Sequence, residues 1–248
     1  MTWPEPIARA LADLELKAPD DAPWETMVVM PGEAAFEAWK RLAEASRGNG
    51  YWPLILGPET DAAQWPRQPR EEREASAAEA IADADGVDLS SFMLRGADEV
   101  DEEFDGSVVD EGEWPDAGEV EPQSAPSAVA DHKQRPHARV AIGLFRADEP
   151  WQALARLGFG GWNDCPETAG HVARHRDWQA RYGAVPCAAT GDTLECLVAS
   201  PPTTRKAAMK LAREHYFYCY DIVEQGTGDL ATLAATLLKA PVWYFWWD

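Results

Sequence analysis

The chain has 248 residues, of which 46% are hydrophobic, and a formal net charge of −21 at pH 7. This apolar fraction is enough for one large core or two small ones. No apolar run approaches the roughly 18 residues that cross a bilayer. Nucleic-acid binding needs Lys and Arg to displace counterions from phosphates, so the charge argues against that class and favours a basic protein as partner.

The N-terminus and the cysteines favour a cytoplasmic location. Residues 1–5 lack the basic start and the apolar stretch of a signal peptide. The four cysteines are too few for a disulfide scaffold in a chain of this length, and none of them form a CxxC motif. We therefore expect a cytoplasmic protein that has no contact with a membrane and no bound cofactor.

The N-terminal segment has the pattern of a β-α-β unit. Residues 25–30 form a short apolar run that predicts a strand, and residues 51–56 form a second one. Between them, residues 32–47 place their large apolar side chains on one helical face. We assign residues 1–68 to an N-terminal α/β lobe that packs alongside the rest of the protein.

Residues 69–137 have the composition of an acidic connector. It begins with an Ala- and Glu-rich stretch, residues 70–83, that predicts an exposed helix with little to pack against. Residues 98–121 contain twelve Asp and Glu and no Lys or Arg, and a stretch rich in Pro, Ala and Ser follows. Such a composition buries too little apolar surface to offset the entropy of ordering. We expect a partly disordered insertion that is either a solvated linker or a surface that docks a basic partner.

The C-terminal half begins with a strand and two helices. Residues 139–145 predict the strand, residues 151–157 predict a short helix, and a Gly-rich loop follows. Residues 168–182 predict a longer helix that ends at Gly183, a residue type common at helix C-termini.

A β-hairpin is the clearest local signal. Residues 185–190 and 193–199 flank Gly191-Asp192, and Gly at this position is what a two-residue type II′ turn requires. Counting outward pairs Ala189 with Leu194, Cys187 with Cys196 and Val185 with Val198, all on one face, with Glu195 on the other. We interpret the two facing thiols as small core residues rather than as a disulfide.

Two helices and an aromatic strand complete the chain. A long helix follows Pro201-Pro202-Thr203, and Asp229 is a suitable N-cap for the last helix. The apolar stripe of the long helix consists of Ala208, Leu211, Ala212, His215, Cys219 and Ile222. Residues 243–247 are five consecutive aromatics, which predict a strand that avoids water on both faces. We expect an α+β fold with a mixed sheet, packed helices and a C-terminal domain over residues 138–248.

Two groups of side chains could carry chemistry. Cys165 precedes a helix N-terminus, which lowers the pKa of a thiol, and His171 or His175 could act as its base. His171 and His175 could alternatively bind zinc together with His215 and Cys219, since each pair shares a helical face. Against both stands the interpretation that these are buried structural side chains, and we expect no metal.

A third group could line a ligand pocket. The Gly-rich loop presents Trp162, Asn163 and Asp164, while Asp221 and Gln225 precede the Gly226-Thr227-Gly228 turn. We expect these side chains to meet near Asp248 if the aromatic strand is docked. The structural alternative is that they cap helix ends.

The C-terminal half also contains a series of distinctive short motifs. They are Gly160-Gly161-Trp162-Asn163-Asp164-Cys165-Pro166, Trp178, Arg181-Tyr182-Gly183, Pro201-Pro202-Thr203, Tyr218-Cys219, and residues 221–226 and 243–248. They resemble family 4253 of the bacterial, mostly actinobacterial, domains of unknown function, over about the last hundred residues. That family often has a proline where this chain has Tyr220, which leaves open whether the long helix continues there. The resemblance implies a bacterial intracellular protein and no particular activity.

The leading hypothesis for function is a noncatalytic intracellular interaction protein that docks or neutralises a basic partner. The alternatives are a hydrolase or transferase that uses the Trp162 loop with Cys165 and His171 or His175, with or without zinc, and a small-ligand-binding domain. None of the residues can be assigned a catalytic role from the sequence.

Overall fold

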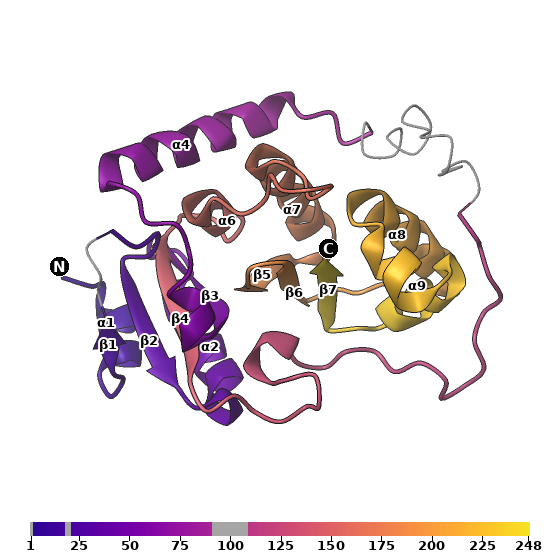
Figure 1. The fold of residues 1–248 in the computed structure, drawn as a ribbon, viewed down its shortest axis with the longest axis horizontal. Coiled ribbons are helices and arrows are strands. Elements are labelled where there is room, and N and C mark those ends of the chain that lie inside the picture. The colour runs from indigo at the N-terminus through magenta and orange to yellow at the C-terminus, as the bar shows by residue number, and fades with distance from the viewer. Residues whose placement is uncertain (1, 18–20, 91–108) are drawn as a thin grey trace.

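One mixed β-sheet runs through the length of the protein (Figure 1). The computed structural model describes residues 2–17, 21–90 and 109–248, and within them the strand order is β1-β2-β4-β3-β5-β6-β7. The strands are β1 (Leu16–Lys17), β2 (Thr26–Met30), β3 (Tyr51–Pro58), β4 (Val140–Arg146), β5 (Ala184–Ala189), β6 (Thr193–Val198) and β7 (Val242–Trp246). With helices packed on this sheet and β7 as a member, the predicted α+β class is confirmed.

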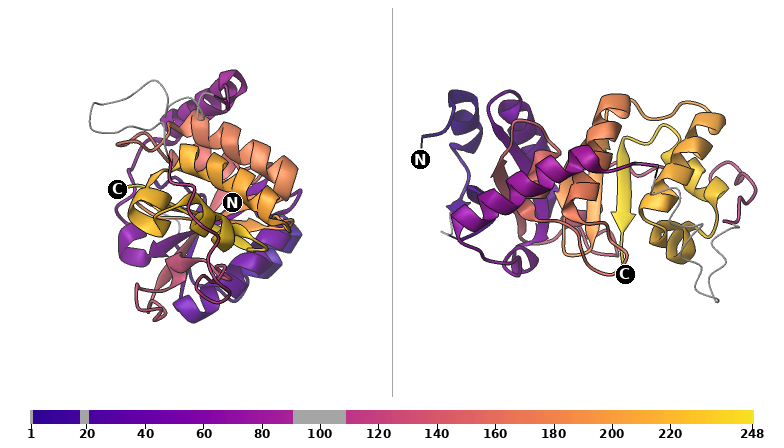
Figure 2. Two further views of the ribbon diagram at one scale, coloured as in Figure 1. Left: turned by 90° about the vertical axis from the view of Figure 1, so that its right-hand side faces the viewer. Right: turned by 90° about the horizontal axis from the view of Figure 1, so that it is seen from above.

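The helices surround the sheet in several groups (Figure 2). Helices α6 and α7 lie beside the strands of the C-terminal half, α4 crosses over both, and α8 and α9 form a pair at one end of the molecule. The helices are α1 (Glu5–Leu11), α2 (Gly32–Ser46), α3 (Glu59–Ala62), α4 (Arg70–Asp83), α6 (Gln152–Leu157), α7 (Thr168–Tyr182), α8 (Arg205–Tyr218) and α9 (Leu230–Leu237), with the 3₁₀ turns η1 (Ala84–Gly86) and η2 (Ser127–Val129) and the π-helix η3 (Ile222–Thr227). No helix of the described residues is long and apolar enough to cross a membrane.

The predicted β-α-β unit is present as β2, α2 and β3, but its two strands are not neighbours. Strand β4 lies between β2 and β3 and is antiparallel to both. Because β4 is buried along almost its whole length, it suits a central position, flanked by a strand on each side. The N-terminal lobe and the C-terminal half are therefore joined through one continuous sheet.

The hairpin of β5 and β6 forms, but its predicted register holds only near the turn. Ala189 lies opposite Leu194 as expected, whereas a register shift between Pro186 and Ala188 places Pro186, not Cys187, opposite Cys196. Pro186 has no N–H to donate to the ladder, which favours an irregularity beside it. The predicted type II′ turn is also wrong, because Gly191 does not have the positive φ that this turn requires. All four cysteines are free thiols.

The C-terminal strand β7 is docked, as expected, at one edge of the sheet. Trp243, Phe245 and Trp247 are buried beneath the helices. Tyr244 points to the other face and is 37% exposed, so the expectation that both faces avoid water is wrong for this residue. The run is uniformly aromatic but still obeys the alternation of a strand, since successive side chains point to opposite faces.

Helix α4 is exposed, as predicted, but it does have a packing partner. Its one buried residue, Ala77, enters a small second core with side chains from α6 and α7. The other buried members of this core are Ala84, Ala155, Val172 and Ala173. Small side chains on α4 are sufficient for this packing because they let the helix lie close to α6 and α7.

Residues 109–137, which we call the strap, run around α8 and α9 and then along the sheet to α2 (Figure 1). At its far end the strap joins α2 through a hydrogen bond from the Gly32 N–H to the His137 carbonyl, 2.8 Å long. The strap contains little regular structure but makes defined contacts. The remaining residues of the acidic run, 98–108, lie outside the described residues.

Candidate functional site

The fold brings the predicted pocket residues to the C-terminus of the chain. Asn163 donates from its side-chain amide to the carbonyl of Asp248. The backbone N–H of Asp248 donates to Asp221 over 3.1 Å, and the side-chain amide of Gln225 donates to the same carboxylate over 2.8 Å. Asp164 accepts a hydrogen bond from the Tyr220 hydroxyl. Four of the six predicted residues are thus linked in one network.

The network has a structural consequence for the last strand. Asp221 is buried and holds the backbone of the terminal residue, while Trp162 packs on Phe159 with ring centroids 5.1 Å apart. Phe159 in turn contacts Trp247, so the Gly-rich loop covers the end of β7. Asn163, Asp164, Gln225 and Asp248 remain exposed and form a polar surface cluster around this end.

A second cluster is a buried chain of hydrogen-bonded side chains, which we call the His–Tyr chain. Cys165 Sγ lies 3.3 Å from His171 Nε2, and His171 Nδ1 contacts the hydroxyl of Tyr218. The same hydroxyl lies 2.9 Å from His175 Nε2, and His175 Nδ1 lies 3.4 Å from Cys196 Sγ. The chain connects helix α7, helix α8 and strand β6 through thiol, imidazole and phenol groups.

The geometry of the His–Tyr chain constrains its proton positions. A neutral imidazole donates from one nitrogen and accepts at the other, and a phenol donates once. The Tyr218 hydroxyl can therefore donate to only one of the two imidazoles, and at least one imidazole must donate to it.

Burial keeps every member of the chain uncharged at neutral pH. It lowers the pKa of His171 to about 3 and the pKa of His175 well below its ordinary value. It also raises the pKa of the Cys165 and Cys196 thiols. The expectation that a helix N-terminus lowers the Cys165 pKa is therefore wrong in direction, because desolvation of the thiolate outweighs the helix dipole.

The four side chains considered as alternative zinc ligands do not converge. His215 lies among aromatic rings, and neither of its ring nitrogens has a hydrogen-bond partner in the described part of the chain. Cys219 donates to the carbonyl of Trp246 over 2.9 Å. No group of three or more His, Cys, Asp or Glu among the described residues is placed to hold a metal ion.

The sequence gave no indication of the roles of two further residues, Tyr218 and Glu214. Tyr218 occupies the centre of the His–Tyr chain, although its partners are 47 and 43 residues away. Glu214 accepts two hydrogen bonds from the Arg181 guanidinium, each 2.8 Å long, and a third from Trp178, which ties α8 to α7. Neither contact has a local sequence signal, because the partners lie on different helices.

Glu195 is a buried carboxylate on the other face of the sheet, as the hairpin pattern predicted for its orientation. It accepts hydrogen bonds from the Gln123 side chain at 2.6 Å, from the Ser127 N–H at 2.7 Å and from the Ala128 N–H at 3.1 Å. Burial raises the pKa of Glu195, and these donors oppose that rise. The carboxylate thereby anchors the strap to the centre of β6.

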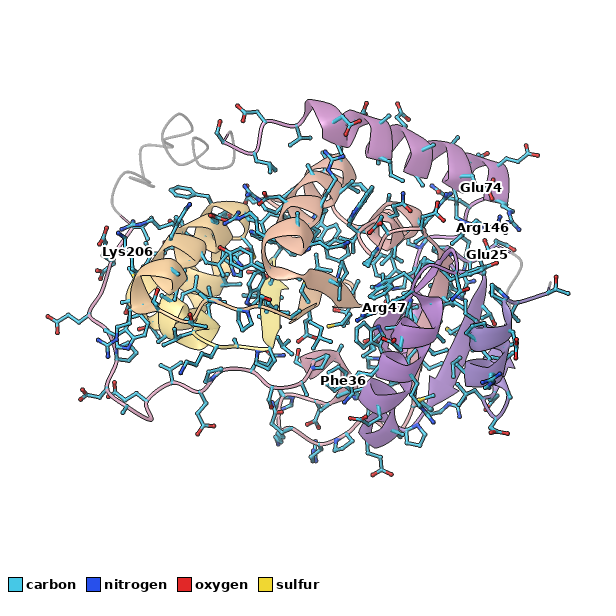
Figure 3. All side chains as sticks on the ribbon, turned by 180° about the vertical axis from the view of Figure 1, so that it is seen from behind. Glu25, Phe36, Arg47, Glu74, Arg146 and Lys206 are labelled. Carbon is cyan, nitrogen blue, oxygen red and sulfur yellow. The ribbon has the colours of Figure 1, made fainter. Side chains whose placement is uncertain are left out.

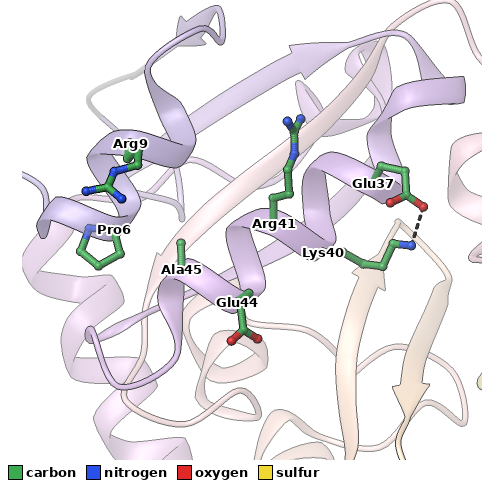
Figure 4. A pocket seen from close by; sticks show the side chains of 7 residues that line it. All are labelled: Pro6, Arg9, Glu37, Lys40, Arg41, Glu44 and Ala45. Carbon is green, nitrogen blue, oxygen red and sulfur yellow. Dashed lines mark ion pairs between the residues drawn. The ribbon is translucent and has the colours of Figure 1, made fainter.

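A surface groove of about 570 Å³ lies elsewhere, between α1 and α2 (Figure 4). It is lined by Pro6, Arg9, Glu37, Lys40, Arg41, Glu44 and Ala45. Lys40 pairs with Glu37 and Arg9 pairs with Glu5, so most of its charges are satisfied within the protein. None of the predicted site residues borders this groove.

The fold and these clusters define an α+β protein whose C-terminal half is closed by a docked aromatic strand and a buried His–Tyr chain. Residues 141–248 match the family model of a domain of unknown function, DUF4253. The predicted resemblance to this family is thereby confirmed for the C-terminal part of the chain, and the match includes both clusters. No curated protein and no solved structure shows significant similarity to the chain.

Proposed function

We propose that the protein is a noncatalytic interaction protein of the bacterial cytoplasm, and that it docks a basic protein through the acidic outer side of the strap. Four exposed carboxylates carry the proposal: Glu113, Asp116, Glu119 and Glu121. No described cation lies within ion-pair distance of any of them. A partner that brings Lys and Arg side chains would meet these carboxylates without first breaking an internal ion pair.

The strap also supports the proposal by holding these charges in place. Val109 and Trp114 are partly buried against the core, whereas the four acids are exposed. Glu119 accepts a hydrogen bond from the backbone of Asp116, which shapes the turn between them. A row of fixed charges steers an oppositely charged protein and sets its orientation more than it adds raw affinity.

The buried position of the reactive side chains supports a noncatalytic function. Cys165 is 5% exposed and His171 and His175 are fully buried, where they hydrogen-bond to one another through Tyr218. Four free buried thiols are also what a reducing compartment such as the cytoplasm maintains.

The proposal is tested by binding of a labelled deca-lysine peptide to the purified full chain at several salt concentrations. Neutralising the four strap acids, as Glu113→Gln, Asp116→Asn, Glu119→Gln and Glu121→Gln, should weaken binding at least tenfold at low salt. The matched control neutralises four exposed acids of α4, as Glu71→Gln, Glu72→Gln, Glu79→Gln and Asp83→Asn. Equal losses in the two variants would show that net charge, not the strap, attracts the peptide.

One contact favours a second candidate, a thiol-dependent hydrolase or transferase. Cys165 Sγ lies 3.3 Å from His171 Nε2, and Tyr218 orients the imidazole from its other nitrogen, an arrangement found in nucleophile–base–orienter sites. This function requires Cys165 to become accessible and ionised. Iodoacetamide labelling of the native protein followed by mass spectrometry tests it: faster reaction of Cys165 than of a free thiol, lost in His171→Ala, would favour the enzyme.

A further inference from the structure

The first part of the strap is seated on the N-terminus of α9. The backbone N–H of Leu230 donates to the carbonyl of Asp110 over 3.0 Å, and that of Ala231 donates to the carbonyl of Glu111 over 3.0 Å. These N–H groups belong to the first turn of α9, where no intrahelical acceptor exists. The helix therefore recognises two successive main-chain carbonyls of an extended segment.

Two arginines of α8 recognise the side chains of the same segment. Arg213 forms an ion pair with Glu111. The guanidinium of Arg205 lies 4.6 Å from the ring centroid of Trp114, in a cation–π contact. Two cations on one face of α8 thus contact a carboxylate and an aromatic ring that are three residues apart in the strap.

Gly112 lies between these two contacts and cannot be replaced without moving the segment. Its φ is +63°, a conformation that residues with a side chain rarely adopt. A Cβ atom on this residue would lie 2.2 Å from Cγ of Asp229, the N-cap of α9. The site consequently requires glycine after the carboxylate that binds Arg213.

Helix α8 carries more positive charge than the neighbouring strap residues neutralise. Arg205 and Lys206 occupy its first turn, where cations oppose the helix dipole, and no acidic residue accompanies them there. Lys206 and Lys210 are exposed on the same side, and neither forms an ion pair within the described residues. Lys206 lies on the outer side of α8 (Figure 3). These two lysines extend the cationic surface beyond the part that the strap covers.

We propose that Arg205, Arg213 and the N-terminus of α9 form a binding site for an acidic, extended segment of a partner protein. The segment has an acidic residue, a glycine, any residue and an aromatic residue in that order. Residues 111–114 of this chain, Glu-Gly-Glu-Trp, occupy the site as an internal ligand. A partner segment displaces them and adds further acids opposite Lys206 and Lys210.

The contacts favour a protein segment over a nucleic acid as the occupant. The two α9 N–H groups donate to the carbonyls of two consecutive residues, and the close approach at Asp229 needs a glycine, which has no side chain. Asp229 would also repel a phosphate backbone at this position. This site binds an acidic segment, whereas the outer acids of the strap are proposed to bind a basic protein. The two proposals are independent of each other.

The internal ligand can be removed without changing the site, which gives a direct experiment. Gly112→Ala in the full chain should eject the segment, and the probe is a fluorescent peptide with the sequence of residues 109–115. The internal segment competes at an effective concentration of about 1 mM in the unmodified protein. We therefore expect the Gly112→Ala protein to bind the peptide at least tenfold more tightly. A peptide carrying the same Gly→Ala change should not bind.

Controls separate the site from general charge effects. Adding Arg205→Ala and Arg213→Ala to the Gly112→Ala protein should reduce binding at least tenfold, whereas Arg41→Ala, which removes an exposed cation of α2, should leave it unchanged. A second releasing variant, Glu111→Gln with Trp114→Ala, serves if Gly112→Ala does not fold, as judged by circular dichroism. The proposal is overturned if neither released protein binds the peptide, or if a ten-residue oligothymidine binds as tightly as the peptide.

Discussion

The imidazole of His215 lies against the indole of Trp243, with ring centroids 4.8 Å apart, and neither ring has a hydrogen-bond partner for its nitrogen atoms among the described residues. Trp178 and Phe245 complete an aromatic enclosure around the same imidazole. Burial first, and then the nearby guanidinium groups of Arg174 and Arg181, lower the pKa of His215 well below its ordinary value. The folded protein thus holds this histidine neutral.

Stability should fall as the pH drops through the ordinary histidine range. His171, His175 and His215 have lowered pKa values in the folded state, so the unfolded chain binds more protons below about pH 6.5. Stability is therefore greatest above this pH and is lost progressively as the pH falls, for His171 down to about pH 3. Each proton corresponds to about 1.4 kcal/mol per pH unit, or about 4 kcal/mol per unit for three. Urea unfolding at pH 7.5 and pH 5.5 measures the difference.

A His215→Phe variant measures how much one of these three histidines contributes to the pH dependence of stability. Phenylalanine has a similar volume and leaves no buried nitrogen unpaired, so the variant should be at least as stable at pH 7.5. Its loss of stability on acidification should be smaller by about 1.4 kcal/mol per pH unit. An unchanged pH dependence would mean that His215 is hydrated or protonated in the folded protein.

Removal of the Tyr218 hydroxyl should destabilise the fold. Tyr218→Phe leaves the Nδ1 of His171 and the Nε2 of His175 without their shared partner, which costs about 2 kcal/mol. The control is Tyr216→Phe, which removes a hydroxyl that donates to the exposed Glu224 over 3.0 Å and should cost less than about 1 kcal/mol. Denaturant unfolding compares the two variants, and equal costs would contradict a buried chain.

Most of the stability that strand β7 contributes should come from the side chains on its buried face. Trp243→Ala removes a fully buried indole and should cost about 3 to 5 kcal/mol, whereas Tyr244→Ala removes a side chain that is 37% exposed and should cost about 1 kcal/mol. Deletion of residues 243–248 should abolish cooperative unfolding of the C-terminal half. Near-ultraviolet circular dichroism and thermal unfolding provide the readouts, and a deletion variant that still unfolds cooperatively would disprove the docking of β7.

Glu195 should hold the strap to the sheet. Glu195→Ala deprives the N–H groups of Ser127 and Ala128 of their acceptor, so hydrogen exchange of these amides should accelerate at least tenfold. Glu121→Ala, at an exposed position of the same strap, is the control and should leave the exchange unchanged. Similar exchange in both variants would show that the strap is held by other contacts.

Local chemistry in the sequence was sufficient to locate most helices and strands. Helix α7 begins and ends where its pattern predicts, with Gly183 as its C-terminal stop, and Asp229 caps α9 by accepting from the Thr232 N–H over 2.7 Å. The long helix α8 ends at Tyr218, before the position where the resemblance to DUF4253 left its course open. Capping and periodicity involve residues that are close in the chain, so they can be recognised in a single sequence.

The candidate site was predictable in part. Asn163, Asp221 and Asp248 were grouped as possible lining of one pocket, and in the structure hydrogen bonds connect them. The sequence left open whether His171 or His175 faces Cys165, and it gave no sign of the burial that keeps these groups neutral. Solvent exclusion depends on every element packed around a group, and no local pattern encodes it.

The amino-acid sequence by itself determined the α+β class, the amphipathic helices and the commitment of the aromatic C-terminus to a strand, because these depend on side-chain periodicity and on turn and capping chemistry. Only the tertiary structure decided that β4 separates β2 from β3, that Tyr218 joins two histidines, and that the strap segment with Gly112 lies on α9. These are pairings between distant residues, which are selected by the free energy of the whole packed chain and not by any short segment of it.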